Sequence, residues 1–177
     1  MPWTPAAISR RRRAALDRGR SACDILGRVI RHENVILLVE DDPADVELTR
    51  RAVAEAALAS KVRVAPDAGM ALDYLRGRGA FEGRDPRRVP ALVLLGLALP
   101  DPSGFELLTT IRAEETTRHV PVVVLARAED DQHLNESYDV GANSCVRKPT
   151  SVDEFVEAVR ELALYWLVIN EKPHPDE

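Results

Sequence analysis

Charged side chains follow two apolar segments of the chain, where a binding or catalytic site could form. Glu40 and Asp41 come directly after the apolar run Val35–Val39, and Lys148 follows the shorter segment 143–147. Paired carboxylates suit a hard divalent cation such as Mg²⁺, which binds one or two carboxylates together with water and phosphate oxygens. In a second interpretation, the carboxylates solvate a loop and Lys148 neutralises their charge. The residue types therefore predict either a metal site or a cluster of ion pairs.

A glycine stands near the end of the apolar stretch 91–97, where a strand and a loop should meet. Gly96 offers no side chain for packing and loses more backbone entropy than other residues, so it weakens a strand. Two explanations fit this position. Either the backbone approaches another group closely here, or a side chain has been lost.

The sequence lacks the motifs that define several common enzymes. It contains no GxxxxGK(S/T) or GxGxxG loop for phosphates, no HExxH zinc motif and no GxSxG nucleophile motif. Cys23 and Cys145 lie far apart and form no CxxC pair, so neither a disulfide framework nor a zinc site is supported. We therefore expect a non-catalytic protein in the reducing cytoplasm.

Charge is distributed unevenly along the 177 residues. Residues 1–33 hold eight arginines against three carboxylates, a net charge of +5, so the remainder carries −10. The run Arg10–Arg13 could bind nucleic acid or an anionic membrane, but such runs commonly stay solvated. We expect a basic extension over residues 1–33, disordered or partly helical, and neither nucleic acid nor a membrane as partner. No apolar run approaches the roughly 20 residues of a membrane-spanning helix.

Apolar runs alternate with segments of helical periodicity over residues 34–169, the predicted domain, which a tail of residues 170–177 follows. The runs have the length of buried strands and cover residues 35–40, 61–65, 91–97, 121–126 and 143–148. Helices are expected after Asp42, Asp67 and Ser103, which suit N-caps, from about residue 130 and from Ser151. This alternation predicts an α/β fold, in which helices cover both faces of a five-stranded parallel sheet. Ligands bind such sheets at the carboxyl ends of the strands.

The last helix carries more apolar residues than one face can bury. One stripe is predicted to face the sheet and consists of Val152, Phe155, Val159, Leu162 and Trp166. Further apolar residues surround the end of this helix, which indicates a contact with another subunit. We expect a homodimer with Tyr165, Trp166 and Ile169 in the interface. In an alternative interpretation, Tyr165 and Trp166 only seal the edge of the sheet.

Four segments together resemble the receiver domain of two-component response regulators. They are VILLVEDDPADVELT, LVLLGLALPDPSGFELL, PVVVLA and SYDVGANSCVRKPTSVDEFVEAV. SYDVGAN and the later YWLVINEKP also resemble the single-domain regulators that work with bacterial and cyanobacterial phytochromes. The resemblance implies the flavodoxin-like, doubly wound order of strands.

The resemblance also implies roles for individual residues. Gly96 stands where the family has the aspartate that accepts a phosphoryl group from a histidine kinase. Glu40 and Asp41 match the acidic metal-binding pair, and the carbonyl of Ala98 matches the backbone metal ligand. Lys148 matches the lysine that contacts the phosphoryl group.

Two further positions depart from the family pattern. Ala126 replaces a threonine or serine whose hydroxyl contacts the phosphoryl oxygens. Cys145 stands at the switch position, where an aromatic residue usually changes rotamer on activation. A redox switch at Cys145 is an alternative use of that position, although a small buried thiol is the more common role for cysteine.

These departures favour a pseudo-receiver that acts by protein binding without aspartyl phosphorylation. Its expected partners are a sensor histidine kinase, such as a bacteriophytochrome, or another receiver, and its Mg²⁺ site is expected to be weakened. The alternative is an unconventional receiver that is phosphorylated on another carboxylate, Asp42 or Asp101. Asp101 would have to move by several ångströms to reach the usual acceptor position, and phosphoryl transfer depends steeply on such placement.

Overall fold

The computed structural model of the chain describes residues 34–56, 60–99, 103–127 and 131–171. The predicted basic extension over residues 1–33, most of the predicted tail and Asp101 lie outside these ranges. Within them, no helix combines the length and the apolar content that a membrane crossing requires.

Five parallel strands form one sheet. They are β1 (Asn34–Val39), β2 (Ser60–Ala65), β3 (Leu92–Gly96), β4 (Val122–Ala126) and β5 (Ser144–Arg147). The strands lie side by side in the order β2-β1-β3-β4-β5, and each neighbouring pair is parallel. β3 and β4 are buried along their whole length, as expected for nearly all-apolar strands in a sheet that is covered on both faces. The predicted doubly wound α/β fold is confirmed.

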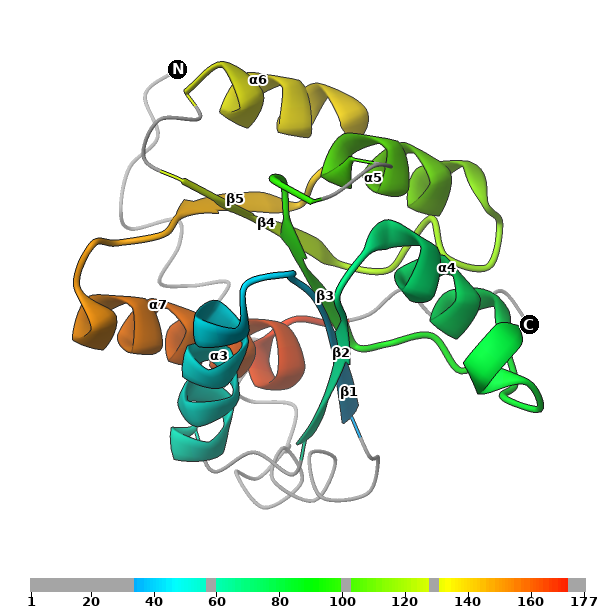
Figure 1. Cartoon of the computed structure of the whole chain (residues 1–177), viewed down its shortest axis with the longest axis horizontal. Coiled ribbons are helices and arrows are strands. Elements are labelled where there is room, and N and C mark those ends of the chain that lie inside the picture. The colour runs from blue at the N-terminus through cyan, green and yellow to red at the C-terminus, as the bar shows by residue number, and fades with distance from the viewer. Residues whose placement is uncertain (1–33, 57–59, 100–102, 128–130, 172–177) are drawn as a thin grey trace, which may run out of the picture. The chain divides into compact units, whose positions relative to one another are not determined.

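Helices connect the strands and cover both faces of the sheet (Figure 1). They are α3 (Pro43–Glu55), α4 (Ala68–Arg76), α5 (Gly104–Ala113), α6 (Asp131–Val140) and α7 (Val152–Leu164). α3 and α7 pack together on one face, while α4, α5 and α6 lie on the other. Two short turns complete the described elements, η1 (Gly79–Phe81) and the π-helical turn η2 (Tyr165–Ile169), which continues α7.

Side-chain caps explain where three of these helices begin. Asp42 and Asp67 each accept a hydrogen bond from a backbone amide in the first turn of α3 and α4. Ser103 forms a reciprocal capping box at the start of α5. All three caps agree with the sequence prediction.

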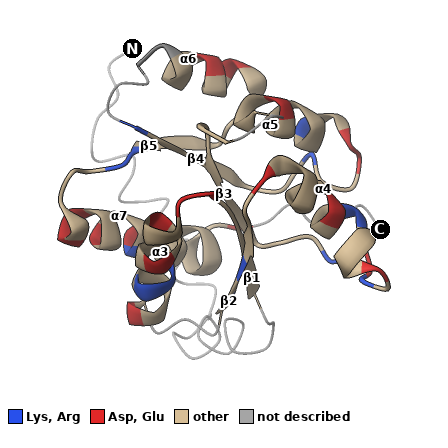
Figure 2. Ribbon diagram, viewed as in Figure 1, with Lys and Arg blue, Asp and Glu red and all other residues tan. Residues whose placement is uncertain are grey.

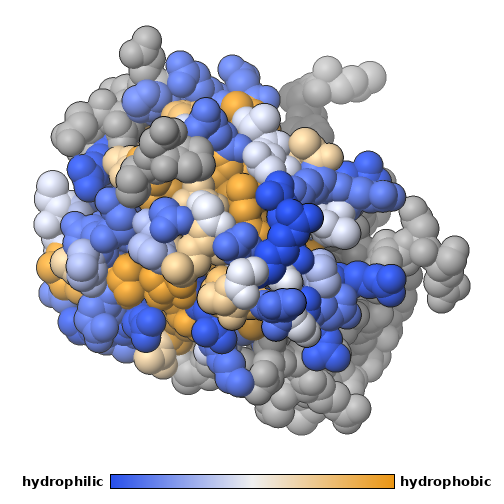
Figure 3. Space-filling view, turned by 45° about the vertical axis from the view of Figure 1, so that its right-hand side comes forward, coloured by the Kyte–Doolittle hydropathy of each residue, from blue (hydrophilic) through white to orange (hydrophobic). Residues whose placement is uncertain are grey.

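Alternate residues of the strands face two apolar cores. Leu37 and Val93 belong to the core beneath α4 and α5, while Ile36 and Leu38 belong to the core beneath α3 and α7. On the face shown in Figure 3, most described residues are hydrophilic, with apolar areas between them.

The prediction that Val152 faces the sheet as part of the apolar stripe on α7 is wrong. Val152 lies in the first turn of the helix and is 50% exposed. The residues that face the sheet begin one turn later, at Phe155 and Val156, which are both buried. The apolar periodicity was therefore extended one turn too far toward the helix N-terminus.

The start of α5 lies directly against the end of β3. A Cβ atom on Gly104 would lie 2.5 Å from the carbonyl oxygen of Gly96 and 3.0 Å from the Cα atom of Leu97. Both of these neighbours are backbone atoms, which cannot rotate away. Gly104 is thus required for the close approach that holds β3 in place at the carboxyl edge of the sheet.

We predict that Gly104→Ala lowers the free energy of unfolding by about 1–3 kcal/mol, because the new methyl group must push the end of β3 aside. The midpoint of urea unfolding measures this change. Gly69→Ala is the matched control, since a Cβ there meets only the Asp67 side chain, at 3.2 Å. A stability loss no larger than that of the control would contradict the role of Gly104.

Candidate functional site

The carboxyl ends of four strands bring the predicted site residues to one edge of the sheet. Glu40 follows β1, Gly96 ends β3, Ala126 ends β4, and Lys148 follows β5. The amide of Lys148 donates to the carbonyl of Ala126 at 2.8 Å, so the lysine continues the register of the sheet. Figure 2 shows acidic residues in the loop after β1 and at the start of α3, opposite basic residues at the end of β5.

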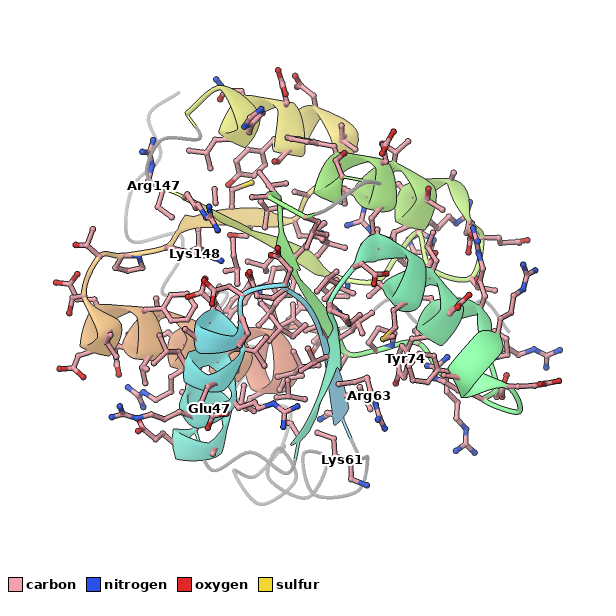
Figure 4. All side chains as sticks on the ribbon, viewed as in Figure 1. Glu47, Lys61, Arg63, Tyr74, Arg147 and Lys148 are labelled. Carbon is pink, nitrogen blue, oxygen red and sulfur yellow. The ribbon has the colours of Figure 1, made fainter. Side chains whose placement is uncertain are left out.

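Lys148 binds two carboxylates at this edge. Its Nζ atom lies 2.7 Å from Oε2 of Glu40 and 2.6 Å from Oδ2 of Asp45. The side chain of Lys148 is 12% exposed, that of Glu40 is 3% exposed and that of Asp45 is 24% exposed. In Figure 4, Lys148 points from the end of β5 toward the start of α3. Lys148 thus joins both carboxylates in one ion-pair cluster.

The second carboxylate, Asp45, was missed by the sequence analysis. It lies in the first turn of α3, one turn beyond the helix cap Asp42. Its place in the first turn of the helix that follows β1 is the signal that could have found it, because that turn begins at the carboxyl edge of the sheet. Only the fold shows which carboxylates Lys148 can reach.

The contacts of Lys148 act on its pKa in opposite directions. Burial is the largest effect and lowers the pKa of the ammonium, because desolvation disfavours the charged form. The hydrogen bonds and charges of Asp45 and Glu40 together outweigh this penalty, so the pKa of Lys148 is raised. Lys148 therefore stays charged at neutral pH.

The glycine at the end of β3 lies close to the same cluster. A Cβ atom on Gly96 would lie 3.0 Å from Oε2 of Glu40 and 3.3 Å from the carbonyl oxygen of Val39. Glu40 also accepts a hydrogen bond from the amide of Asp42 at 3.3 Å. A larger residue at position 96 would thus press on a carboxylate that already has partners.

The Mg²⁺ ligands that the resemblance implies are only partly available at this edge. Glu40 is engaged by Lys148, while Asp41 and Ala98 are exposed, and Gly96 has no carboxylate. In the described part of the chain, no three His, Cys, Asp or Glu side chains converge so that they could hold a metal ion. Asp42 is also engaged, because its Oδ1 atom accepts from the Ala44 amide at 2.8 Å.

Ala126 and Cys145, the two remaining positions, bring neither a hydroxyl nor a charged group to this edge. Ala126 is fully buried. Cys145 is half-buried, and its Sγ atom lies 3.9 Å from the carbonyl oxygen of Leu134. Burial raises the pKa of the Cys145 thiol, which keeps it in the less reactive protonated form. Its backbone amide donates to the hydroxyl of Tyr138 at 3.2 Å.

Comparison with known families agrees with the geometry. Residues 36–160 match the response regulator receiver domain. The chain is similar to "Probable methanogenesis regulatory protein FilR2" of Methanothrix harundinacea, with 38% identity over 141 residues, which cover 80% of this chain and 88% of that protein.

Solved structures of receivers are similar as well. The phosphorylated cyanobacterial phytochrome response regulator RcpA has a TM-score of 0.74 and 30% identity, and the match covers 81% of this chain and all of RcpA. The Mn²⁺-bound form of Rcp1, a Synechocystis response regulator, has a TM-score of 0.72 and 28% identity over 80% of this chain and 99% of Rcp1. The bacteriophytochrome response regulator AtBRR has a TM-score of 0.63 and 42% identity over 79% of this chain and 99% of AtBRR.

We predict that Lys148→Met lowers the free energy of unfolding by about 3–5 kcal/mol at neutral pH, because it leaves two carboxylates without their cation. Since the pKa of Lys148 is raised by folding, the stabilisation is fully present below the pKa of an unfolded lysine, about 10.4. It is lost as the pH rises through the higher folded value.

Urea unfolding of both proteins between neutral and strongly alkaline pH measures this difference. Arg160→Met is the control, because it removes one positive charge from an exposed pair with Glu157 on α7. That change should have little effect at any pH. A Lys148→Met effect as small as the control would show that the cluster does not stabilise the fold.

Proposed function

The chain belongs to the family of response regulator receiver domains, and we propose that within this family it is a pseudo-receiver, which acts by binding other proteins without aspartyl phosphorylation. Gly96 carries this proposal, because it occupies the end of β3, where the resemblance places the phosphoryl acceptor. Response regulators of this family serve two-component signalling, so the binding partners belong to a phosphorelay.

The chemistry of phosphoryl transfer explains why this glycine matters. Transfer to a receiver needs an in-line carboxylate nucleophile, a cation near the transferring oxygens and positioned donors. Gly96 supplies no nucleophile, and its neighbours Leu95 and Leu97 are apolar and buried. Ala126 supplies no hydroxyl donor. Asp42, one of the two alternative acceptors, is engaged as the cap of α3.

The cation site is weakened for the same reason. Rcp1, a relative, has a Mn²⁺-bound form. In this chain the pocket lacks the carboxylate that position 96 would contribute, and Mg²⁺ gains its affinity from such ligands. A lower Mg²⁺ affinity than that of phosphorylatable receivers follows.

The partner is a sensor histidine kinase or another receiver. RcpA and AtBRR are regulators of phytochromes by their names, and both are similar to this chain over most of its length. We therefore include a bacteriophytochrome among the histidine kinases that this chain would bind. The proposed place of this interaction is the cytoplasm. By occupying the kinase or a second receiver, a protein that takes no phosphoryl group would compete with the working regulator or hold it in place.

A homodimer is the assembly that the C-terminal turn supports. Tyr165 is 48% exposed and Ile169 is 67% exposed on η2, although both are apolar in character. Trp166 packs partly into the core and stacks edge to face on Tyr165, with ring centroids 5.1 Å apart. Tyr165 and Trp166 line a groove of about 540 Å³ together with residues of β5 and α7. A second copy of the chain would cover this surface.

We predict that the purified protein gains no phosphoryl mass when it is incubated with acetyl phosphate and Mg²⁺, because no acceptor carboxylate is in line. Intact-mass spectrometry measures the product. Gly96→Asp is the comparison, and a gain of mass in that variant alone would support the proposal. A phosphorylated native chain would show that another carboxylate is the acceptor, and the pseudo-receiver interpretation would be wrong.

For the homodimer, we predict that Ile169→Glu lowers the mass measured by light scattering after size exclusion, because a charge enters the apolar contact. Val152→Glu is the matched control, since Val152 is also exposed on the same helix but lies at its other end. Equal masses for the native chain and both variants would exclude η2 from the interface.

A further inference from the structure

We propose that Lys148 is the resident cation of this pocket. Its ammonium group bridges Glu40 and Asp45 and takes the place of a divalent ion, so the native protein holds this edge of the sheet together without a metal. This inference deepens the proposed function and rests on it only for the loss of the acceptor carboxylate at Gly96.

The geometry around the ammonium supports this role. Nζ of Lys148 lies within 2.7 Å of a carboxylate oxygen of Glu40 and 2.6 Å of one of Asp45. The resemblance implies Glu40 as a ligand of Mg²⁺, which would need its carboxylate oxygen at about 2.0–2.1 Å, in near-octahedral order. The ammonium and a divalent ion therefore compete for Glu40, because Lys148 already binds one of its oxygens.

The burial of the Glu40 carboxylate favours a cation that belongs to the protein itself. Glu40 is 3% exposed, so its charge must be paired inside the protein. Burying the ammonium of Lys148 costs desolvation, which its two carboxylates outweigh. Because Lys148 is attached to the chain, it reaches the carboxylates without being captured from bulk solution, whereas Mg²⁺ must be captured and gives up its water reluctantly.

Gly96 allows the arrangement to persist. An added Cβ would lie 3.0 Å from the same oxygen of Glu40 that Lys148 binds. A carboxylate on that Cβ would add a third negative charge beside Glu40 and draw Lys148 or a metal ion toward β3. With glycine at this position, no third carboxylate competes with Glu40 and Asp45 for Lys148.

Asp45 is the second anchor and determines what the bridge connects. Glu40 belongs to the loop after β1, Asp45 belongs to the first turn of α3, and Lys148 belongs to the segment after β5. One ammonium thus joins three segments that only the fold brings together. The start of α3 is held in one position by a side chain of the protein itself rather than by an ion from solution.

The test counts bound Mn²⁺ by electron paramagnetic resonance, because binding removes the sharp signal of the free ion. The native chain and Arg160→Met, which removes a charge elsewhere, should show only weak, unsaturated binding. Lys148→Met should bind one Mn²⁺ per chain about tenfold or more tightly, because a unit positive charge a few ångströms away is gone. Adding Glu40→Gln to Lys148→Met should abolish that gain.

Gly96→Asp provides a second route if Lys148→Met does not fold. It should also bind one Mn²⁺, since it adds a carboxylate and keeps the lysine. One tightly bound Mn²⁺ in the native chain would overturn the proposal, whatever the variants do. If a native chain that binds one Mn²⁺ tightly also gains no mass with acetyl phosphate, the proposal of Lys148 as the resident cation is wrong. The pseudo-receiver function is then still supported. A gain of mass in a native chain that binds no Mn²⁺ would overturn the function alone.

Discussion

The ammonium of Lys148 contacts two carboxylates from different segments, and the carboxyl edge of the sheet depends on these contacts. Glu40 is almost fully buried, and an unpaired charge at that depth would be costly. The bridge therefore has to form whenever the domain folds. It also sets the character of the edge, because one lysine engages both Glu40 and Asp45.

Close packing between the end of β3 and the start of α5 also restricts the carboxyl edge of the sheet. Gly96 ends the strand between Glu40 and the start of α5, where Gly104 lets the helix approach the backbone. The absence of a side chain at position 96 keeps the ion pair undisturbed. Under the proposed function, the fold of a receiver is preserved while the acceptor carboxylate is missing, so fold and phosphorylation chemistry would be separable properties of this architecture.

A binding role suits such a frame. The chain has the sheet and the helices of a receiver, and its similarity to RcpA and AtBRR covers most of its length. If Lys148 occupies the pocket as we propose, phosphate or metal would have little to act on, because a ligand shifts an equilibrium only through different affinities for two states. We infer that partner recognition relies on a surface that stays the same.

The sequence by itself determined the class of fold and predicted a site at the carboxyl edge of the sheet. Apolar runs of strand length, alternating with capped helices, are enough to predict a parallel sheet with function at its carboxyl edge, because these patterns are local. It also determined that Gly96 carries no nucleophile, since this follows from residue type alone. The sequence could not assign Val152 to solvent, because periodicity does not show where a helix leaves the sheet. Only the tertiary structure decided that Lys148 binds Asp45 as well as Glu40. The lysine lies more than 100 residues from both carboxylates, and the register of β5 and the direction of α3 together bring them within hydrogen-bond distance.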